Sequence, residues 1–101
     1  MLVEFSVVPI GSGSSLSEVV AGVLELVDSS GLPYKINPMG TVVEGEWEEV
    51  LPLIKRCHDS VMKRGERVMT HIAIDDRKGK PDRIDRKVKS VEDRLGRTLK
   101  K

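Results

Sequence analysis

Apolar residues follow two different spacings along this chain, and the spacings change from one segment to the next. Four segments have the alternation and β-branched content typical of strands, namely residues 2–10, 34–38, 41–45 and 67–75. Three segments carry apolar residues every three or four positions, as amphipathic helices do, namely residues 16–27, about 50–62 and 82 to about 97. This order predicts an α+β protein with a ferredoxin-like βαββαβ arrangement. Two helices then cover one face of a four-stranded antiparallel sheet, and a C-terminal helix follows.

Residues near the helix ends predict where two of the helices begin. Ser15 and Glu18 have the spacing of a capping box at the start of the first helix. Pro52 lacks a backbone N–H and is tolerated in a first turn, so we expect the regular part of the second helix to start near Glu49 to Leu51.

Composition predicts one small domain over residues 1–101. The chain is 39% hydrophobic and 33% charged, with 3% aromatic residues and a single cysteine. One cysteine excludes an internal disulfide and fits a reducing compartment. No apolar run approaches the roughly 20 residues of a membrane-spanning helix, and Glu4 interrupts the N-terminal apolar stretch, so we expect neither membrane insertion nor a signal peptide. A cytoplasmic location is therefore expected.

The charges are unevenly distributed. Residues 1–76 carry a balance of −6, and residues 77–101 carry a balance of +7. A basic tail can bind nucleic acid, dock on the acidic body of a second copy, or simply face solvent. Because aromatic residues that could stack on bases are so few, we expect no nucleic-acid partner.

Strand alternation divides the first and fourth strands into two faces. The side expected under the helices carries Val3, Phe5, Val7, Val68, Thr70, Ile72 and Ile74. The opposite side carries Glu4, Ser6, Val8, Met69, His71 and Ala73. This second, open face is too apolar for a purely solvated surface, and we interpret it as covered by another subunit with a polar pocket nearby. A half-exposed sheet in a monomer is the alternative.

Catalytic motifs are weak, and we expect a protein that is not an enzyme. Cys57 and His58 are neighbours on a helix and so diverge by about 100°, which favours a buried thiol beside a hydrogen-bonded histidine. The segment Gly11-Ser12-Gly13-Ser14-Ser15 could hold a phosphate, but a capped turn is the stronger interpretation. Asp75 and Asp76 point opposite ways at a strand end and make a poor metal chelate.

Residues 34–45 carry the most informative chemistry. Glu44 precedes Gly45 late in a half-buried strand, and a partly buried carboxylate requires a partner. An amino-bearing ligand could supply that partner through a paired N–H contact, with Thr41 and Ser6 adding hydroxyl groups and Tyr34 an aromatic wall. A Lys or Arg at a subunit boundary is the alternative partner for Glu44.

Several short motifs along almost the whole chain resemble one known family. They are Glu4-Phe5-Ser6 with Pro9, Ser29-Ser30-Gly31-Leu32-Pro33-Tyr34, Pro38-Met39-Gly40-Thr41 with Glu44-Gly45, Lys55-Arg56-Cys57-His58, and Ile74-Asp75-Asp76-Arg77-Lys78-Gly79. In this order and spacing the chain resembles the small thiamine-binding proteins of the YkoF-like, ferredoxin-fold group.

The resemblance implies a non-catalytic homotetramer, built as a dimer of dimers, that binds thiamine or its hydroxymethylpyrimidine part and holds no other cofactor. It places Ser6, Thr41 and Glu44 around the pyrimidine, with Tyr34 and Asn37 as weaker candidates. His71 is a departure, because a small hydroxyl residue is expected there. A regulatory or scaffolding homo-oligomer without a small ligand is the alternative function.

Overall fold

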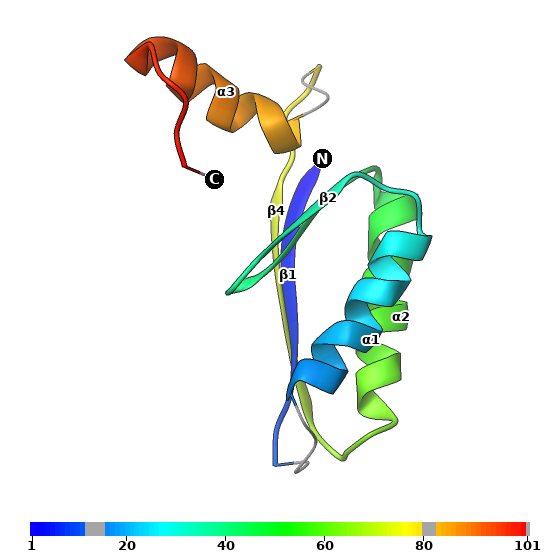
Figure 1. The fold of residues 1–101 in the computed structure, drawn as a ribbon. Helices are drawn as coiled ribbons and strands as arrows, with labels where there is room; N and C mark the ends of the chain where they lie inside the picture. Colours follow the sequence, from blue (N-terminus) through cyan, green and yellow to red (C-terminus); the bar gives the residue numbers. More distant parts are fainter. Residues whose placement is uncertain (12–15, 80–82, 101) are drawn as a thin grey trace.

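The computed structural model describes residues 1–11, 16–79 and 83–100 of the chain. Its elements follow the predicted order: β1 (Leu2–Pro9), α1 (Leu16–Ser29), β2 (Tyr34–Asn37), β3 (Gly40–Glu44), α2 (Trp47–Met62), β4 (Val68–Asp75) and α3 (Arg83–Leu95). The strands form one antiparallel sheet in the order β2-β3-β1-β4. Figure 1 shows α1 and α2 side by side on one face of this sheet, which confirms the ferredoxin-like prediction.

The core lies between the sheet and these two helices. Alternate residues of β1 face the helices, and the same face of β3 contributes Val43. The buried apolar cluster consists of Val3, Phe5, Val7, Val19, Val23, Val27, Val43, Val50, Leu53, Ile54, Cys57 and Val61. Valine side chains dominate it, and Phe5 is the aromatic residue among them.

The first strand has two different neighbours along its length. On one side, β4 pairs with all of β1, from Leu2 opposite Asp75 to Pro9 opposite Val68. On the other side, the register with β3 runs only from Leu2 opposite Glu44 to Phe5 opposite Thr41. The second half of β1 therefore leaves one edge without a strand in the described part of the chain.

The outer strand β4 differs from the prediction. Ile72 and Ile74 lie on the helix side of the sheet, where they pair with Phe5 and Val3, yet they are 42% and 39% exposed. The expectation that helices cover them is wrong, because β4 is the edge strand of the sheet, whereas the neighbouring β1, with Val3 and Phe5 buried at the same level, lies inside it.

The start of α2 also differs from the prediction. The helix begins at Trp47, before the expected Glu49 to Leu51, and Pro52 lies inside it. The Glu49 carboxylate accepts a hydrogen bond of 3.0 Å from the Glu46 backbone N–H, so a capping box satisfies this helix end early. Leu53, the residue after Pro52, is fully buried. The predicted capping box of the first helix involves Ser15, which lies outside the described residues.

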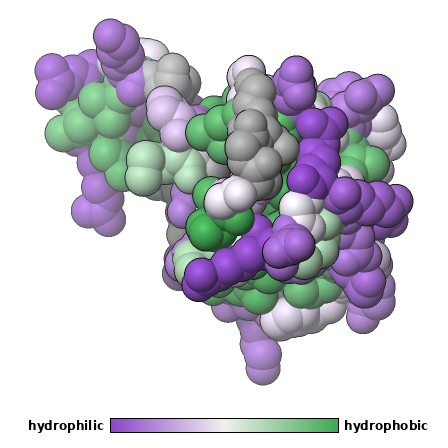
Figure 2. Space-filling view, turned by 90° about the horizontal axis from the view of Figure 1, so that it is seen from below, coloured by the Kyte–Doolittle hydropathy of each residue, from purple (hydrophilic) through white to green (hydrophobic). Residues whose placement is uncertain are grey.

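The third helix extends from the end of the sheet where β1 begins (Figure 1). Its first turn contacts the sheet through Glu44 and through an ion pair of 2.5 Å between Lys35 and Asp85. Farther along the helix, Val91 and Leu95 are 48% and 52% exposed. In the view from below, this helix projects from the body with apolar side chains on its surface (Figure 2).

Candidate functional site

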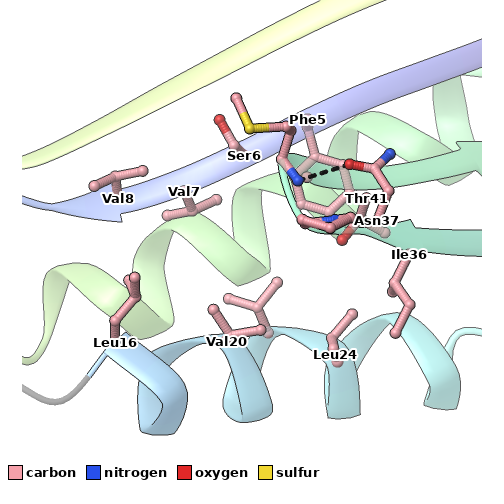
Figure 3. A pocket seen from close by; sticks show the side chains of 14 residues that line it. Phe5, Ser6, Val7, Val8, Leu16, Val20, Leu24, Ile36, Asn37 and Thr41 are labelled. Carbon is pink, nitrogen blue, oxygen red and sulfur yellow. Dashed lines mark hydrogen bonds between the residues drawn. The ribbon is translucent and has the colours of Figure 1, made fainter.

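A cavity of about 300 Å³ lies beside the unpaired half of β1. Its walls come from the second half of β1, the tip of the β2–β3 hairpin and the first turns of α1 (Figure 3). The lining side chains are Phe5, Ser6, Val7, Val8, Leu16, Val20, Val23, Leu24, Ile36, Asn37, Pro38, Met39 and Thr41, with Gly40 between the last two. None of these described residues carries a charge. The site therefore suits an uncharged, largely apolar group that needs a few hydrogen bonds.

The hairpin tip owes its position to two residues. A Cβ atom on Gly40 would lie 2.9 Å from the Phe5 carbonyl oxygen, so glycine is needed for the tip to lie this close to β1. The Met39 backbone N–H donates a hydrogen bond of 2.8 Å to Asn37 Oδ1, which closes the turn (Figure 3). Asn37 thus lines the cavity and also shapes its wall.

Thr41 is the buried polar side chain of this site. It is 7% exposed, lies opposite Phe5 in the register, and lines the cavity. Among the described residues, no protein group forms a hydrogen bond with its hydroxyl. Buried hydroxyl groups are usually paired, so this one has a hydrogen bond to offer to a molecule in the cavity.

Ser6 lies at the rim, where two hollows meet. Its side chain points away from α1, to the opposite side of β1 from Val7 (Figure 3). It lines the cavity and also a shallower hollow of about 180 Å³ on the open face, which includes Glu4, Met39 and His71. His71 is exposed there and pairs with Ser6 across the two strands. As the alternation predicted, the open face carries exposed Glu4, Val8, Met69 and His71.

Three predicted ligand residues lie outside the cavity, with His71 in the adjoining hollow and Glu44 and Tyr34 in neither. The Glu44 carboxylate is half-buried and accepts a hydrogen bond of 3.1 Å from the backbone N–H of Ile84 in the first turn of α3. The Tyr34 hydroxyl donates a hydrogen bond of 2.8 Å to Asp28 Oδ1, which raises the pKa of Tyr34 above its ordinary value. The structure thus gathers Ser6, Asn37 and Thr41, leaves His71 in the adjoining hollow, and places Tyr34 and Glu44 elsewhere.

Sequence reasoning missed the apolar walls that α1 and β2 contribute. Leu16 and Val20 on α1 are 60% and 44% exposed, and Ile36 on β2 is 59% exposed. All three point into the space between α1 and the sheet (Figure 3). Leu16 and Val20 fit the helical pattern of the core, so their position gave no signal of a ligand. The brevity of β2 and β3, at four and five residues, could have indicated the gap.

The Cys57–His58 pair has the structural role that was expected. Cys57 is fully buried, and burial raises the pKa of its thiol to about 11. His58 Nδ1 lies 2.7 Å from Thr70 Oγ1, within hydrogen-bond distance. A thiol with a raised pKa is a poor nucleophile at neutral pH. Among the described residues, no group of three or more His, Cys, Asp or Glu side chains could hold a metal ion.

Comparison with known proteins identifies the class of molecule. The family model for thiamine-binding proteins matches residues 3–92 of the chain. The UPF0045 protein MJ1052 of Methanocaldococcus jannaschii is 36% identical over 91 residues, which cover 90% of this chain and 91% of the relative. The UPF0045 protein MT1949 of Mycobacterium tuberculosis is 40% identical over 93 residues, or 91% of each chain. The chain therefore belongs to the thiamine-binding protein family.

Solved structures agree with this assignment. The crystal structure of MJ1052 superposes with a TM-score of 0.81 at 37% identity and covers 89% of this chain and 93% of its own. A Thermotoga maritima protein, TM0486, is a candidate for thiamine biosynthesis or salvage. Its structure gives a TM-score of 0.77 at 30% identity, and the match covers 89% of this chain and 96% of TM0486. The family is named for binding and not for catalysis. No helix among the described residues has the length and apolar content needed to cross a membrane.

Proposed function

We propose that this protein binds thiamine, or its hydroxymethylpyrimidine moiety, in the cavity between α1 and the β2–β3 hairpin, and does so without chemical turnover. The observation that carries the proposal is the buried Thr41 hydroxyl, which faces an uncharged apolar cavity without a described protein partner. Membership of the thiamine-binding family supports the same ligand class.

The character of the walls favours the pyrimidine end of the ligand. A methylpyrimidine is flat, uncharged and apolar on both faces, so it can lie between Val20 of α1 and the hairpin without leaving a charge unpaired. The positively charged thiazolium of thiamine then extends toward solvent. Acidic side chains predominate in residues 1–76 and favour a cationic group there.

We propose a cytoplasmic homotetramer, arranged as a dimer of dimers, as the functional form. Apolar side chains that a single chain leaves exposed support assembly: Val8 and Met69 on the open face, and Val91 and Leu95 on α3. Its role is to sequester, deliver or sense a thiamine-related compound. The same surfaces also favour a second candidate, a scaffolding homo-oligomer without a small ligand.

Isothermal titration of the full chain with hydroxymethylpyrimidine and with thiamine tests the proposal. We expect heat of binding for the pyrimidine, and an affinity about threefold to tenfold lower for Thr41→Val, because one neutral hydrogen bond contributes about 0.5–1.5 kcal/mol. Thr98→Val removes an exposed hydroxyl and serves as the matched control. Flat traces for both ligands, together with a tetramer by light scattering, would favour the scaffold.

A further inference from the structure

The unpaired edge of β1 presents backbone hydrogen-bonding groups to the cavity. In an antiparallel strand, successive residues direct their N–H and C=O groups to opposite sides. Met1 and Gly45 exchange hydrogen bonds of 2.9 and 3.1 Å, so odd-numbered residues of this strand face the β3 side. Ile10 donates a bond of 2.9 Å to the Arg67 carbonyl, so even-numbered residues face β4.

Val7 is the residue at which this edge meets the cavity. The register with β3 ends at Phe5, so the next residue with its backbone on that side is Val7, which lines the cavity. Its side chain is 9% exposed and packs in the core, which holds the backbone in place. Pro9, the following odd-numbered residue, has no N–H. Since none of the described residues pairs with Val7 on this side, the edge offers one adjacent donor and acceptor, the N–H and the C=O of Val7.

We propose that the Val7 backbone recognises the ligand by a paired contact, in which its N–H donates to a ring nitrogen and its C=O accepts from an amino group on the neighbouring ring carbon. This inference rests on the proposed function and deepens it, because it defines the ligand class as a neutral aminoheterocycle with that donor–acceptor edge. The 4-aminopyrimidine ring has such an edge. A 4-oxo pyrimidine has the edge reversed, with an N–H toward the Val7 N–H and a carbonyl toward the Val7 carbonyl.

The surroundings favour a small ring over a peptide strand at this edge. A strand that continued the sheet here would occupy the place of the hairpin tip, where Gly40 approaches the Phe5 carbonyl oxygen. Pro9 has no N–H to donate to such a strand, so the added strand would form few backbone hydrogen bonds with β1. A ring needs only the pair at Val7, and the Thr41 hydroxyl on the same cavity can contact a further polar substituent.

Val7→Pro tests the contact, because it deletes the N–H on the unpaired edge and leaves the ladder to β4 intact. Pro9 already occupies the same edge. We expect Val7→Pro to bind hydroxymethylpyrimidine at least tenfold more weakly than Val7→Ala, which loses side-chain atoms but keeps the N–H. Circular dichroism and thermal unfolding establish that both variants are folded.

Two measurements on the wild-type chain keep the test decisive if Val7→Pro does not fold. The 4-oxo analogue should bind at least tenfold more weakly than the 4-amino compound, and the ¹⁵N–¹H resonance of Val7 should move downfield when the 4-amino compound is added. Equal affinities of the folded Pro and Ala variants, equal affinities for the two pyrimidines, or an unmoved Val7 resonance overturn this inference and leave the proposed function standing. A wild-type chain that binds neither pyrimidine nor thiamine overturns both.

Discussion

The carboxylate of Glu44 accepts a hydrogen bond of 3.1 Å from the backbone N–H of Ile84, and this contact joins the end of β3 to the first turn of α3. The first N–H groups of a helix have no partner within the helix, and a negative charge at that end also interacts favourably with the helix dipole. Glu44 is therefore partly buried because it anchors a helix.

We predict that Glu44→Ala loosens α3 and leaves ligand affinity unchanged within twofold. The free energy of unfolding should fall by about 0.5–2 kcal/mol, as for loss of a helix cap. Hydrogen exchange of residues 83–95 should become faster, and titration calorimetry measures the affinity. Glu66→Ala changes an exposed carboxylate and is the control. A tenfold loss of affinity with α3 still protected would instead place Glu44 in the binding site, as the sequence suggested.

Gly40→Ala should destabilise the protein by about 1–3 kcal/mol and weaken ligand binding. Its new Cβ would lie 2.9 Å from the Phe5 carbonyl oxygen, so the hairpin tip must move away from the cavity. Gly22→Ala is the matched control, because nothing lies within 4 Å of its Cβ. Gly22 lies in α1, where alanine should raise the free energy of unfolding by about 0.5–1 kcal/mol. Urea unfolding of both variants measures the difference, and equal stabilities would contradict the close approach.

The tyrosine absorbance of the native protein should titrate above pH 10, because the hydrogen bond to Asp28 holds the pKa of Tyr34 above its ordinary value of 10.0. Tyr34 is the single tyrosine, so ultraviolet absorbance reports it directly. Asp28→Asn should bring the pKa back toward 10, whereas Asp59→Asn should leave it raised. Tyr34→Phe should bind the ligand normally, since the side chain lies outside the cavity. A loss of affinity in that variant would restore Tyr34 as a candidate wall of the site.

Cys57 should make stability fall as the solution becomes alkaline. Burial raises the pKa of its thiol from 9.0 to about 11, so the unfolded chain loses this proton at lower pH than the folded protein. The protonated thiol contributes roughly 3 kcal/mol to the free energy of unfolding. This contribution is complete below pH 9 and is lost between pH 9 and about 11.

Urea unfolding of the wild type and of Cys57→Ala across this pH range measures the effect. The difference in stability between the two proteins should shrink as the pH rises. A difference that stays constant up to pH 11 would show that the folded protein ionises the thiol as readily as the unfolded chain does.

The fold was predictable because apolar spacing reports which residues face a core. Val3, Phe5 and Val7 alternate in β1 as predicted and are buried. Which strand residues the helices cover was harder to predict, because this depends on where the helices lie across the sheet. Ile74 has the same apolar character as Val3 but lies on the edge strand, and it is therefore partly exposed.

The candidate site was predictable in its polar residues and not in its location. Hydroxyl and amide groups at Ser6, Asn37 and Thr41 were expected to meet, and they do line one cavity. The contact between Glu44 and the first turn of α3 could not be predicted, because it joins residues 40 positions apart in the sequence.

Ser6 lines the cavity and also the hollow on the opposite side of the same strand. Phe5 and Met39 also line both hollows, so a molecule between α1 and the sheet and a neighbour that covers the opposite face would contact the same three residues. If ligand binding in the cavity changes the affinity for a neighbour on the opposite face, then binding of that neighbour must change the affinity for the ligand by the same factor. In an assembly through the open face, ligand binding in the cavity would change the affinity between subunits. Dissociation of the subunits on dilution would then change the affinity for the ligand by the same factor.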